Sequence, residues 1–279
     1  FNYDQPFVKR AVAGFDAAHI AMTDVNLGID SFFFAAPKIS LRVRAGNFKE
    51  RSGLVVRDLR CPFRMDATSI QLPSLYLLMP NSELSGRLRM DMNAFDDAHP
   101  GTLNAHMDGY VSKTDLHPFL TSIPRNIYQA MPGGRLTIQG TLAGNLRSAS
   151  FQRLRLAMPG YFDLTGTGWV ADMMAKNKPL RSDLRLKGVA QNLGFVQKLL
   201  PASIRKTIAL PQAVAVDGDI HVRKNLYSGS MSLAQGGGKI RVKGAFNPSN
   251  SLYRLTADAT NFPIQRSLPH MGLSPFTGS

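Results

Sequence analysis

The sequence has little cysteine and no long apolar run. Cys61 is the only cysteine among 279 residues, so the chain cannot form an internal disulfide and has no CxxC pair for redox or zinc chemistry. The longest apolar run, FFFAAP at 32–37, is far shorter than the roughly 18 residues that a membrane-spanning helix needs. These absences exclude a disulfide-stapled fold and a spanning helix within this sequence.

Acidic residues are scarce as well. Lys and Arg number 33 against 19 Asp and Glu, a net charge of +14, which favours anionic partners such as lipid headgroups, nucleic acid or an acidic protein. A nucleic-acid surface would require clustered basic residues interleaved with aromatic ones. Here the basic residues recur singly along many segments, so we expect no nucleic-acid partner and keep a basic nucleic-acid-binding protein only as a second alternative.

Catalytic signatures are missing. None of the six histidines belongs to an HExxH pair, and neither Ser52 nor Ser85 lies in a GxSxG motif. The GGGK stretch at 236–239 lacks the spacing of a phosphate-binding loop and precedes a strand pattern, which predicts a hairpin turn. We therefore expect a protein that is not an enzyme and has no catalytic residues.

The remaining candidates for ligand chemistry are isolated. Asp96-Asp97-x-His99 is the densest group of ligand-type residues, but its place before Pro100 is typical of a solvated turn. Asp217 and Asp219 have no His partner in the sequence pattern and are interpreted as surface residues, and Trp169 as a packing anchor. The sequence therefore predicts no metal and no cofactor.

A short phrase occurs three times in the chain. Each copy opens with Asp or Asn before Leu or Phe, continues through mostly apolar residues and closes on Ile-Pro or Leu-Pro. The copies are DLHPFLTSIP at 115–124, NLGFVQKLLP at 192–201 and NFPIQRSLP at 261–269. The closing prolines are 77 (201 − 124) and 68 (269 − 201) residues apart. Recurrence at this period is typical of one supersecondary unit repeated along an elongated scaffold. We expect an N-terminal β-sheet region at 1–108, a repeat unit at 109–201, and a second unit, truncated at its end, at 202–279.

Most of the chain alternates apolar and polar residues with the period of a half-buried strand. The clearest predicted strands are 38–46, 53–59, 69–78, 86–92, 135–146, 151–158, 183–189, 213–222 and 239–246. Short turns rich in Gly, Pro, Asn and Asp separate them, which favours antiparallel meanders. Short helices are expected at 7–15, 114–123 and 191–200.

The predicted strands carry apolar residues on one face and basic residues on the other. We expect the apolar face to contain Leu41, Val43, Leu88, Met90, Leu154, Leu156, Leu184, Leu186, Ile240 and Val242. One interpretation is a closed core beneath a solvated basic face. The other is an apolar groove that is only partly covered. Because few helical residues are available for a second layer, the pattern favours the groove. The predicted fold is mainly β: an elongated repeat of antiparallel meanders forming a curved, taco-like open sheet with short helices.

One region resembles a known family. Glu50-x-Ser52-Gly53-Leu54, Asp66-x-x-x-Ile70-x-Leu72-Pro73-x-Leu75 and Pro80-x-Ser82-x-Leu84 are similar to the membrane-proximal part of TamB-like proteins of Bacteroidota-type bacteria. TamB is the large subunit of the translocation and assembly module. GGRLTIQGTLAGNLRSASF at 133–151 resembles repeats of the wider AsmA-like superfamily. The chain starts at Phe1 rather than Met, and we expect it to be a fragment of such a protein.

The resemblance implies a periplasmic cell-envelope protein that is anchored to the inner membrane through an N-terminal segment missing here. In this family an apolar groove is linked to phospholipid transport between the inner and outer membranes, and thus to outer membrane biogenesis. The resemblance supplies no catalytic residues. The partners it implies are phospholipid, the inner membrane and an outer-membrane assembly protein. The alternative is a non-enzymatic scaffold that docks such an assembly partner through its edge strands.

Overall fold

The computed structural model describes residues 1–4, 6–7, 9–11, 13–16, 18–94, 99–120, 125–145, 147–172, 181–198, 209, 212–223, 226–247 and 252–261. The protein is mainly β, as the sequence predicts, and it divides into two compact units, Phe1–Asn145 and Leu146–Ser279. The repeat boundaries at 108 and 201 follow a different criterion and stay predictions.

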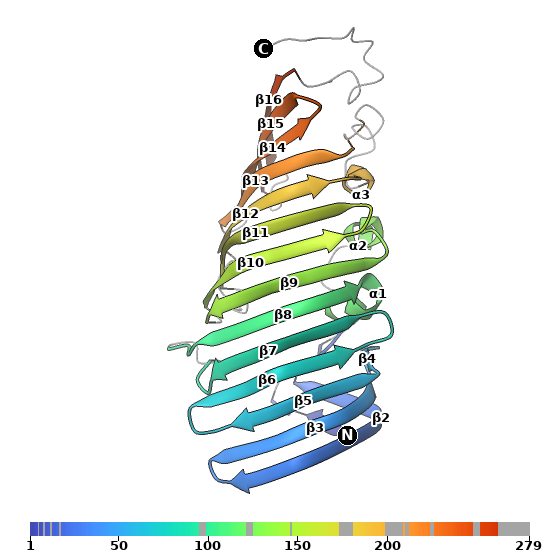
Figure 1. The fold of residues 1–279 in the computed structure, drawn as a ribbon, viewed down its shortest axis with the longest axis vertical. Helices are drawn as coiled ribbons and strands as arrows, with labels where there is room; N and C mark the ends of the chain where they lie inside the picture. The colour runs from blue at the N-terminus through green and yellow to red at the C-terminus, as the bar shows by residue number, and fades with distance from the viewer. Residues whose placement is uncertain are drawn as a thin grey trace. The chain divides into compact units, whose positions relative to one another are not determined.

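The first unit is an open antiparallel meander (Figure 1). Each strand pairs with the next along the chain, except that the short β4 pairs β3 beside the main path and β3 then pairs β5. The strands are β1 (Asn2–Asp4), β2 (His19–Ala35), β3 (Lys38–Glu50), β4 (Val55–Val56), β5 (Asp58–Met65), β6 (Ser69–Leu78), β7 (Glu83–Asp91), β8 (Leu103–Ser112) and β9 (Arg135–Gly144).

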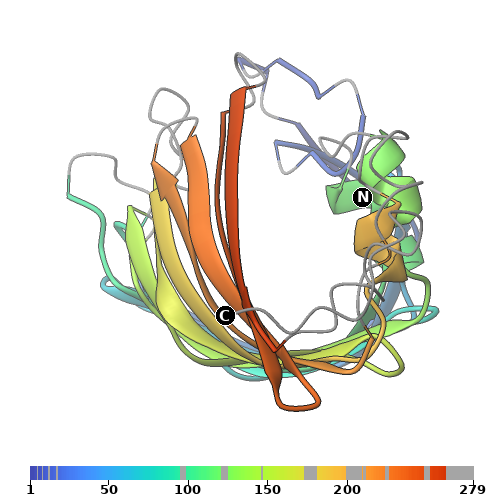
Figure 2. The same cartoon turned by 90° about the horizontal axis from the view of Figure 1, so that it is seen from above.

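The second unit repeats this architecture. Its strands also pair in chain order and antiparallel. They are β10 (Ser148–Met158), β11 (Phe162–Ala171), β12 (Arg181–Ala190), β13 (Val214–Arg223), β14 (Leu226–Gln235), β15 (Gly238–Asn247) and β16 (Leu252–Thr260). In each unit the strands bend, so that the sheet has a concave and a convex side (Figure 2).

Several of the strand predictions are confirmed by the structure. The segment 69–78 is β6 over its full length, and 239–246 lies within β15. The predicted strand 53–59 is wrong as one element, because Arg57 separates two strands, β4 and β5. Six of the strands were not predicted: β1, β2, β8, β11, β14 and β16.

Helices are short and occur in the connections between strands. In the first unit α1 (Lys113–Leu116), η1 (His117–Phe119) and α2 (Arg125–Ala130) join β8 to β9, and in the second α3 (Gly194–Gln197) lies between β12 and β13. The helix predicted at 114–123 is therefore an α turn followed by a 3₁₀ turn, and 121–124 lie outside the described residues. The helix predicted at 7–15 is wrong for the described part of that segment, which contains turns and bends.

Some predictions fall outside the described residues. The closing prolines of all three phrase copies, and nearly all of the third copy at 261–269, belong to this group, as do residues 199–200 of the predicted helix at 191–200. Within the described part of the second unit, a small buried cluster contains Ala190, Val214 and Val216, with Leu164, Leu193 and Leu233 packed against them.

Candidate functional site

The register of the second unit aligns its apolar side chains in continuous rows. Directly opposed residues of neighbouring antiparallel strands project to the same face, so a row can be followed from strand to strand. One row contains, in order from β10 to β16, Leu156, Leu164, Gly188, Val216, Leu233, Ile240 and Ala259. We call the face that carries this row the inner face and the opposite one the outer face.

A second inner row runs beside the first, two residues away from it on each strand. It contains Leu154, Gly166, Leu186, Gly218, Met231, Val242 and Ala257. Glycines alternate with large residues in this row. A Cβ at Gly166 would lie 2.8 Å from the Leu186 side chain, so the small residue leaves room for its larger neighbour on a concave surface.

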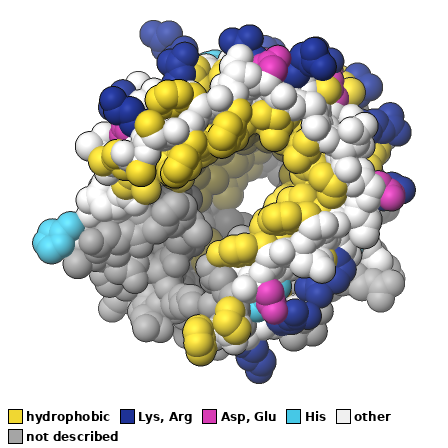
Figure 3. All heavy atoms as spheres, turned by 90° about the horizontal axis from the view of Figure 1, so that it is seen from below, with side chains coloured by type: hydrophobic (Ala, Val, Ile, Leu, Met, Phe, Trp, Pro, Cys, Tyr) yellow, Lys and Arg dark blue, Asp and Glu magenta, His cyan; other side chains and the backbone are white. Residues whose placement is uncertain are grey.

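The first unit has an inner face of the same kind. One of its rows passes through Leu72, Leu88, Ala105 and Leu142, and another through Leu59, Leu77, Leu84, Gly109 and Ile138. Figure 3, which views this unit from the end that carries β2 and β3, shows apolar side chains lining the inside of the curve. Lys and Arg side chains project from the outside.

Among the described residues, no second layer of strands covers the inner faces. In the described part of each unit, all substantial contacts between strands are made by neighbours within the sheet. Large apolar side chains therefore stay accessible: Met107 is 42% and Met231 37% exposed, and Leu27 and Ile29 of β2 about half exposed at 47% and 50%. Folding of the described residues thus leaves part of each apolar inner face accessible to a ligand, whereas a globular protein would bury such a surface.

Short helices shield one end of each inner face. In the second unit Leu193 packs against the buried Val214 and Val216, and the Phe195 ring lies 6.1 Å from the rings of Tyr161 and Phe162. In the first unit the ring centres of Phe15 and of Phe119 in η1 are 5.3 Å apart. Figure 2 shows these helices at one rim of the curve. In the second unit this end holds the buried cluster of Ala190, Val214 and Val216. At the opposite end of the same face Val170 and Val222 are also buried, and among the described residues between the two ends the large apolar side chains are half-buried or exposed.

The ten residues predicted for the apolar face all belong to the inner faces. Leu41, Val43, Leu88 and Met90 lie in the first unit, and Leu154, Leu156, Leu184, Leu186, Ile240 and Val242 in the second. Val43 is buried at 9% exposure, and the other nine are half-buried. The structure places each set on one surface within its unit, and their role in binding a ligand stays a prediction.

Sequence reasoning missed several inner-face residues because it missed their strands. Leu164 lies on β11 and Met231 and Leu233 on β14, where several outward positions hold Thr or Ser in place of charged residues. Alternation of small polar and apolar residues in DLTGTG and SGSMSL was the available signal, but it resembles loop composition.

The outer face is polar and rich in ion pairs. Arg155 and Asp163 form a bidentate pair at 3.0 and 2.6 Å. His221 bridges two carboxylates, with Nδ1 2.5 Å from Asp183 and Nε2 2.8 Å from Asp219. The hydrogen bond with Asp183 raises the pKa of His221, while hydrogen bonds from Arg223 and His221 lower the pKa of Asp183. These contacts fasten neighbouring strands from the outside.

The structure also describes the other residues that the sequence singled out. The 236–239 stretch contains the hairpin turn between β14 and β15: Gly236 and Gly237 form the turn at positive φ, and Gly238 and Lys239 begin β15. Asp217 and Asp219 are surface residues, with side chains 46% and 40% exposed. The expectation that they have no His partner is wrong for Asp219, which pairs with His221 on the same strand. Trp169 lies on the outer face with the Arg223 guanidinium 5.2 Å from its ring centre.

Metal-ligand chemistry has little support in the part of the chain that the structure describes. Asp96 and Asp97 lie outside it, and within it no group of three or more His, Cys, Asp or Glu side chains is placed to hold a metal ion. Cys61 is buried, and this burial raises the pKa of its thiol.

Comparison with models of known protein families, with curated proteins and with solved structures found no match. Among the described residues, no helix is both long and apolar enough to cross a membrane.

Proposed function

We propose that the inner faces bind the acyl chains of phospholipids, and that the chain is a segment of a periplasmic envelope-biogenesis protein that carries lipid between the inner and outer membranes. The observation that supports this most is the pair of uninterrupted apolar rows across the second unit, left open in the described structure. A closed-core protein would place a second layer over such rows.

The dimensions of the rows suit an acyl chain. Neighbouring strands are about 4.8 Å apart, so the six spacings between β10 and β16 give a row of about 29 Å. An acyl chain in one leaflet spans about half of the roughly 30 Å hydrocarbon thickness of a bilayer. One unit is therefore long enough to hold a whole chain against its inner face.

The transfer mechanism is passive. Each methylene that leaves water for the inner face gains about 0.8 kcal/mol. Because similar apolar residues recur at each strand, the gain is similar at each step, and a lipid slides along the rows without a large barrier. The polar headgroup stays at the open, wetter rim. The described residues offer no nucleotide-binding loop, so the direction of transfer is set outside them.

The wider assignment rests on the resemblance to TamB-like and AsmA-like proteins. It comprises the periplasmic location, the inner-membrane anchor and the outer-membrane assembly partner. The basic outer face is compatible with work beside anionic membranes, where each Lys or Arg near the surface contributes about 1 kcal/mol.

The proposal is tested by placing a charge on the inner face. Leu156→Asp and Val242→Asp should abolish phospholipid capture, measured by native mass spectrometry and lipid extraction, because a carboxylate among acyl chains is costly to desolvate. Thr165→Asp is the matched control: Thr165 is exposed on the outer face beside Leu164. Lipid capture that survives both inner substitutions in protein with a strand-type circular-dichroism spectrum would overturn the proposal.

A second candidate function has one specific observation in its favour. β2 pairs with β1 only over His19–Ala21, so within the described residues most of its outer edge is unpaired, beside the exposed Val25 and Leu27. Such an edge is a template for strand addition by a partner. A scaffold that docks an assembly protein there would lose its partner on Val25→Lys and keep it on Val242→Asp, the reverse of the result expected for lipid capture.

A further inference from the structure

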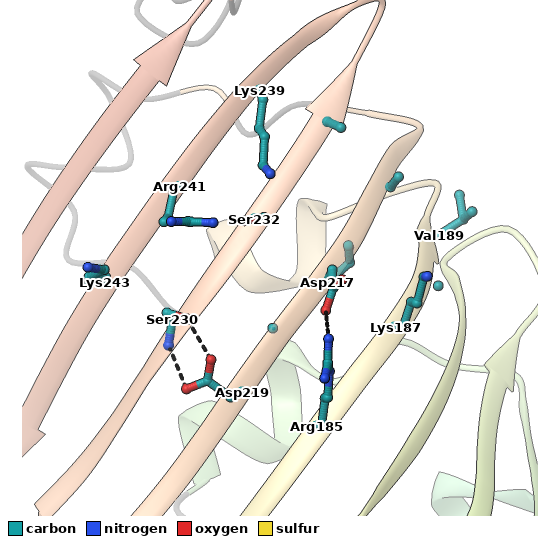
Figure 4. A pocket seen from close by; sticks show the side chains of 15 residues that line it. Arg185, Lys187, Val189, Asp217, Asp219, Ser230, Ser232, Lys239, Arg241 and Lys243 are labelled. Carbon is teal, nitrogen blue, oxygen red and sulfur yellow. Dashed lines mark hydrogen bonds and ion pairs between the residues drawn. The ribbon is translucent and has the colours of Figure 1, made fainter.

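The outer face of the second unit contains a shallow hollow of about 690 Å³ that the lipid proposal does not use. It lies over β12 to β15. Its charged and hydroxyl-bearing lining residues are Arg185, Lys187, Asp217, Asp219, Ser230, Ser232, Lys239, Arg241 and Lys243. Figure 4 shows Lys239, Arg241 and Lys243 along one strand, with the serines and aspartates between them and the basic residues of β12.

The two carboxylates in this hollow already have partners. Asp219 accepts hydrogen bonds from the Ser230 hydroxyl at 2.5 Å and the Ser230 backbone N–H at 3.3 Å, and it pairs with His221 at 2.8 Å. Asp217 pairs with Arg185 at 3.8 Å. The acidic charge in the hollow is therefore compensated by groups within or beside it.

The basic groups outnumber these carboxylates. Five of the lining residues are Lys or Arg and two are Asp, which leaves 5 − 2 = +3. No ion-pair partner is found in the described structure for Lys187, Lys239, Arg241 or Lys243. Asp258 is opposite Arg241 in the β15–β16 register, yet these two residues form no ion pair.

The spacing of the cations matches an anion with several charged groups. Residues 239, 241 and 243 alternate along one strand, so their side chains emerge on one face about 6.8 Å apart. Lys187 approaches from β12 on the other side of the hollow, across β13 and β14. A single carboxylate would reach only one of these groups, whereas linked phosphates would reach several at once. The volume lies within the 300–1,000 Å³ typical of small-ligand sites.

We propose that this hollow binds a ligand that carries two or more phosphate groups. Lys239, Arg241 and Lys243 bind the phosphates from one side and Lys187 from the other, with the Ser232 hydroxyl as an additional donor. Arg185 remains paired with Asp217. The shared chemistry is clustered phosphate, supplied either by a phosphorylated lipid headgroup or by a free phosphate compound. The site is independent of the acyl-chain rows on the opposite face.

The test uses the full chain and tripolyphosphate as the probe in isothermal titration calorimetry. We expect saturable 1:1 binding that weakens about tenfold or more in Lys239→Gln/Arg241→Gln, since each charged hydrogen bond is worth roughly a factor of ten. The charge-preserving Lys239→Arg/Arg241→Lys should retain binding. Arg87→Gln/Arg89→Gln removes the same charge at the same spacing from exposed positions of β7 and should leave binding unchanged.

Two further arms identify the source of phosphate and exclude a general charge effect. Vesicles of phosphatidylglycerol captured by the parent chain and lost in Lys239→Gln/Arg241→Gln indicate a lipid headgroup. Capture that is unchanged while tripolyphosphate binding is lost indicates a free phosphate compound. Poly-glutamate should bind at least tenfold more weakly than tripolyphosphate.

Lysine acetylation provides a measurement that needs no variant. Tripolyphosphate should protect Lys187, Lys239 and Lys243 and leave Lys49 of the first unit reactive. The proposal is overturned by absent saturable binding, by equal loss in the two glutamine double variants, by equal affinity for poly-glutamate, or by uniform protection of all four lysines.

Discussion

The Asp115 carboxylate accepts a hydrogen bond from the Ser82 hydroxyl at 2.7 Å and from the Asn81 backbone N–H at 2.7 Å. The buried Ser82 oxygen in turn accepts from the Ser112 N–H at 2.8 Å. Helix α1 is thereby fastened to the turn between β6 and β7. Asp115 is the first residue of the first copy of the repeated phrase, so this contact explains why an acidic residue stands at that position.

The second copy makes an equivalent attachment by different atoms. The backbone N–H of Asn192 donates to the Tyr161 carbonyl at 3.1 Å, and the Asn192 side chain accepts from the Gly194 N–H at 2.8 Å. Tyr161 lies in the turn between β10 and β11. In both units the Asp or Asn that opens the phrase therefore connects a short helix to the turn before the neighbouring strand.

Removing the Asp115 carboxylate should weaken the attachment of α1 to the turn between β6 and β7. In Asp115→Ala we expect the chain to lose about 2 kcal/mol of unfolding free energy, because hydrogen bonds to a charged acceptor are lost and Ser82 stays buried. Amide hydrogen exchange at 112–119 should accelerate, and urea unfolding gives the free energy. Asp163→Ala, which breaks an exposed ion pair with Arg155, should cost less than about 1 kcal/mol. Equal effects of the two variants would refute the attachment.

A glycine on the inner face of the first unit should tolerate no side chain. Gly109 has φ +148°, and a Cβ there would lie 2.2 Å from the Glu83 carbonyl oxygen. We expect Gly109→Ala to destabilise the chain by at least about 2 kcal/mol, through backbone strain and overpacking. Gly133 has nothing within 4 Å of its Cβ position, so thermal unfolding of Gly133→Ala should match the parent chain. A neutral Gly109→Ala would show that β7 and β8 do not approach so closely.

The network around His221 predicts a pH dependence. Because the Asp183 hydrogen bond raises the pKa of His221 in the folded chain, the protonated ring stabilises the fold. This contribution is fully present below the unfolded value of about 6.5 and is lost as the pH rises through the folded pKa. NMR titration of the imidazole should give an apparent pKa above 6.5, lowered in Asp183→Asn. Asp163→Asn, which does not contact His221, should leave it unchanged. A titration that is identical in the parent chain and Asp183→Asn would contradict the network.

The fold class and the apolar face were predictable from sequence because charged residues mark the outward positions of strands such as β12 and β15. The Arg185 and Lys187 pair, alternating with Leu184 and Leu186, leaves one interpretation of which face is apolar. In β11 and β14 several outward positions hold Thr or Ser, whose alternation with apolar residues is weaker, and these strands were missed.

Other features depend on pairing between segments that are distant in the sequence. The +3 hollow depends on the register that aligns Lys187, Asp217 and Ser232 across three strands. Single-strand periodicity contains no information about that register. The partnership of Asp115 with Ser82 is equally hidden, because it joins residues 33 apart through a helix cap and a turn.

Photo-crosslinking at adjacent residues tests the central claim most directly. A photoreactive amino acid at Leu164 or Met231 projects into the inner face, whereas the same group at Thr165 or Thr167 projects outward. We predict phospholipid adducts at 164 and 231 and none at 165 and 167, detected by mass spectrometry after irradiation in lipid-containing cells or vesicles. Adducts on both faces alike, or on neither, would contradict an acyl-chain groove.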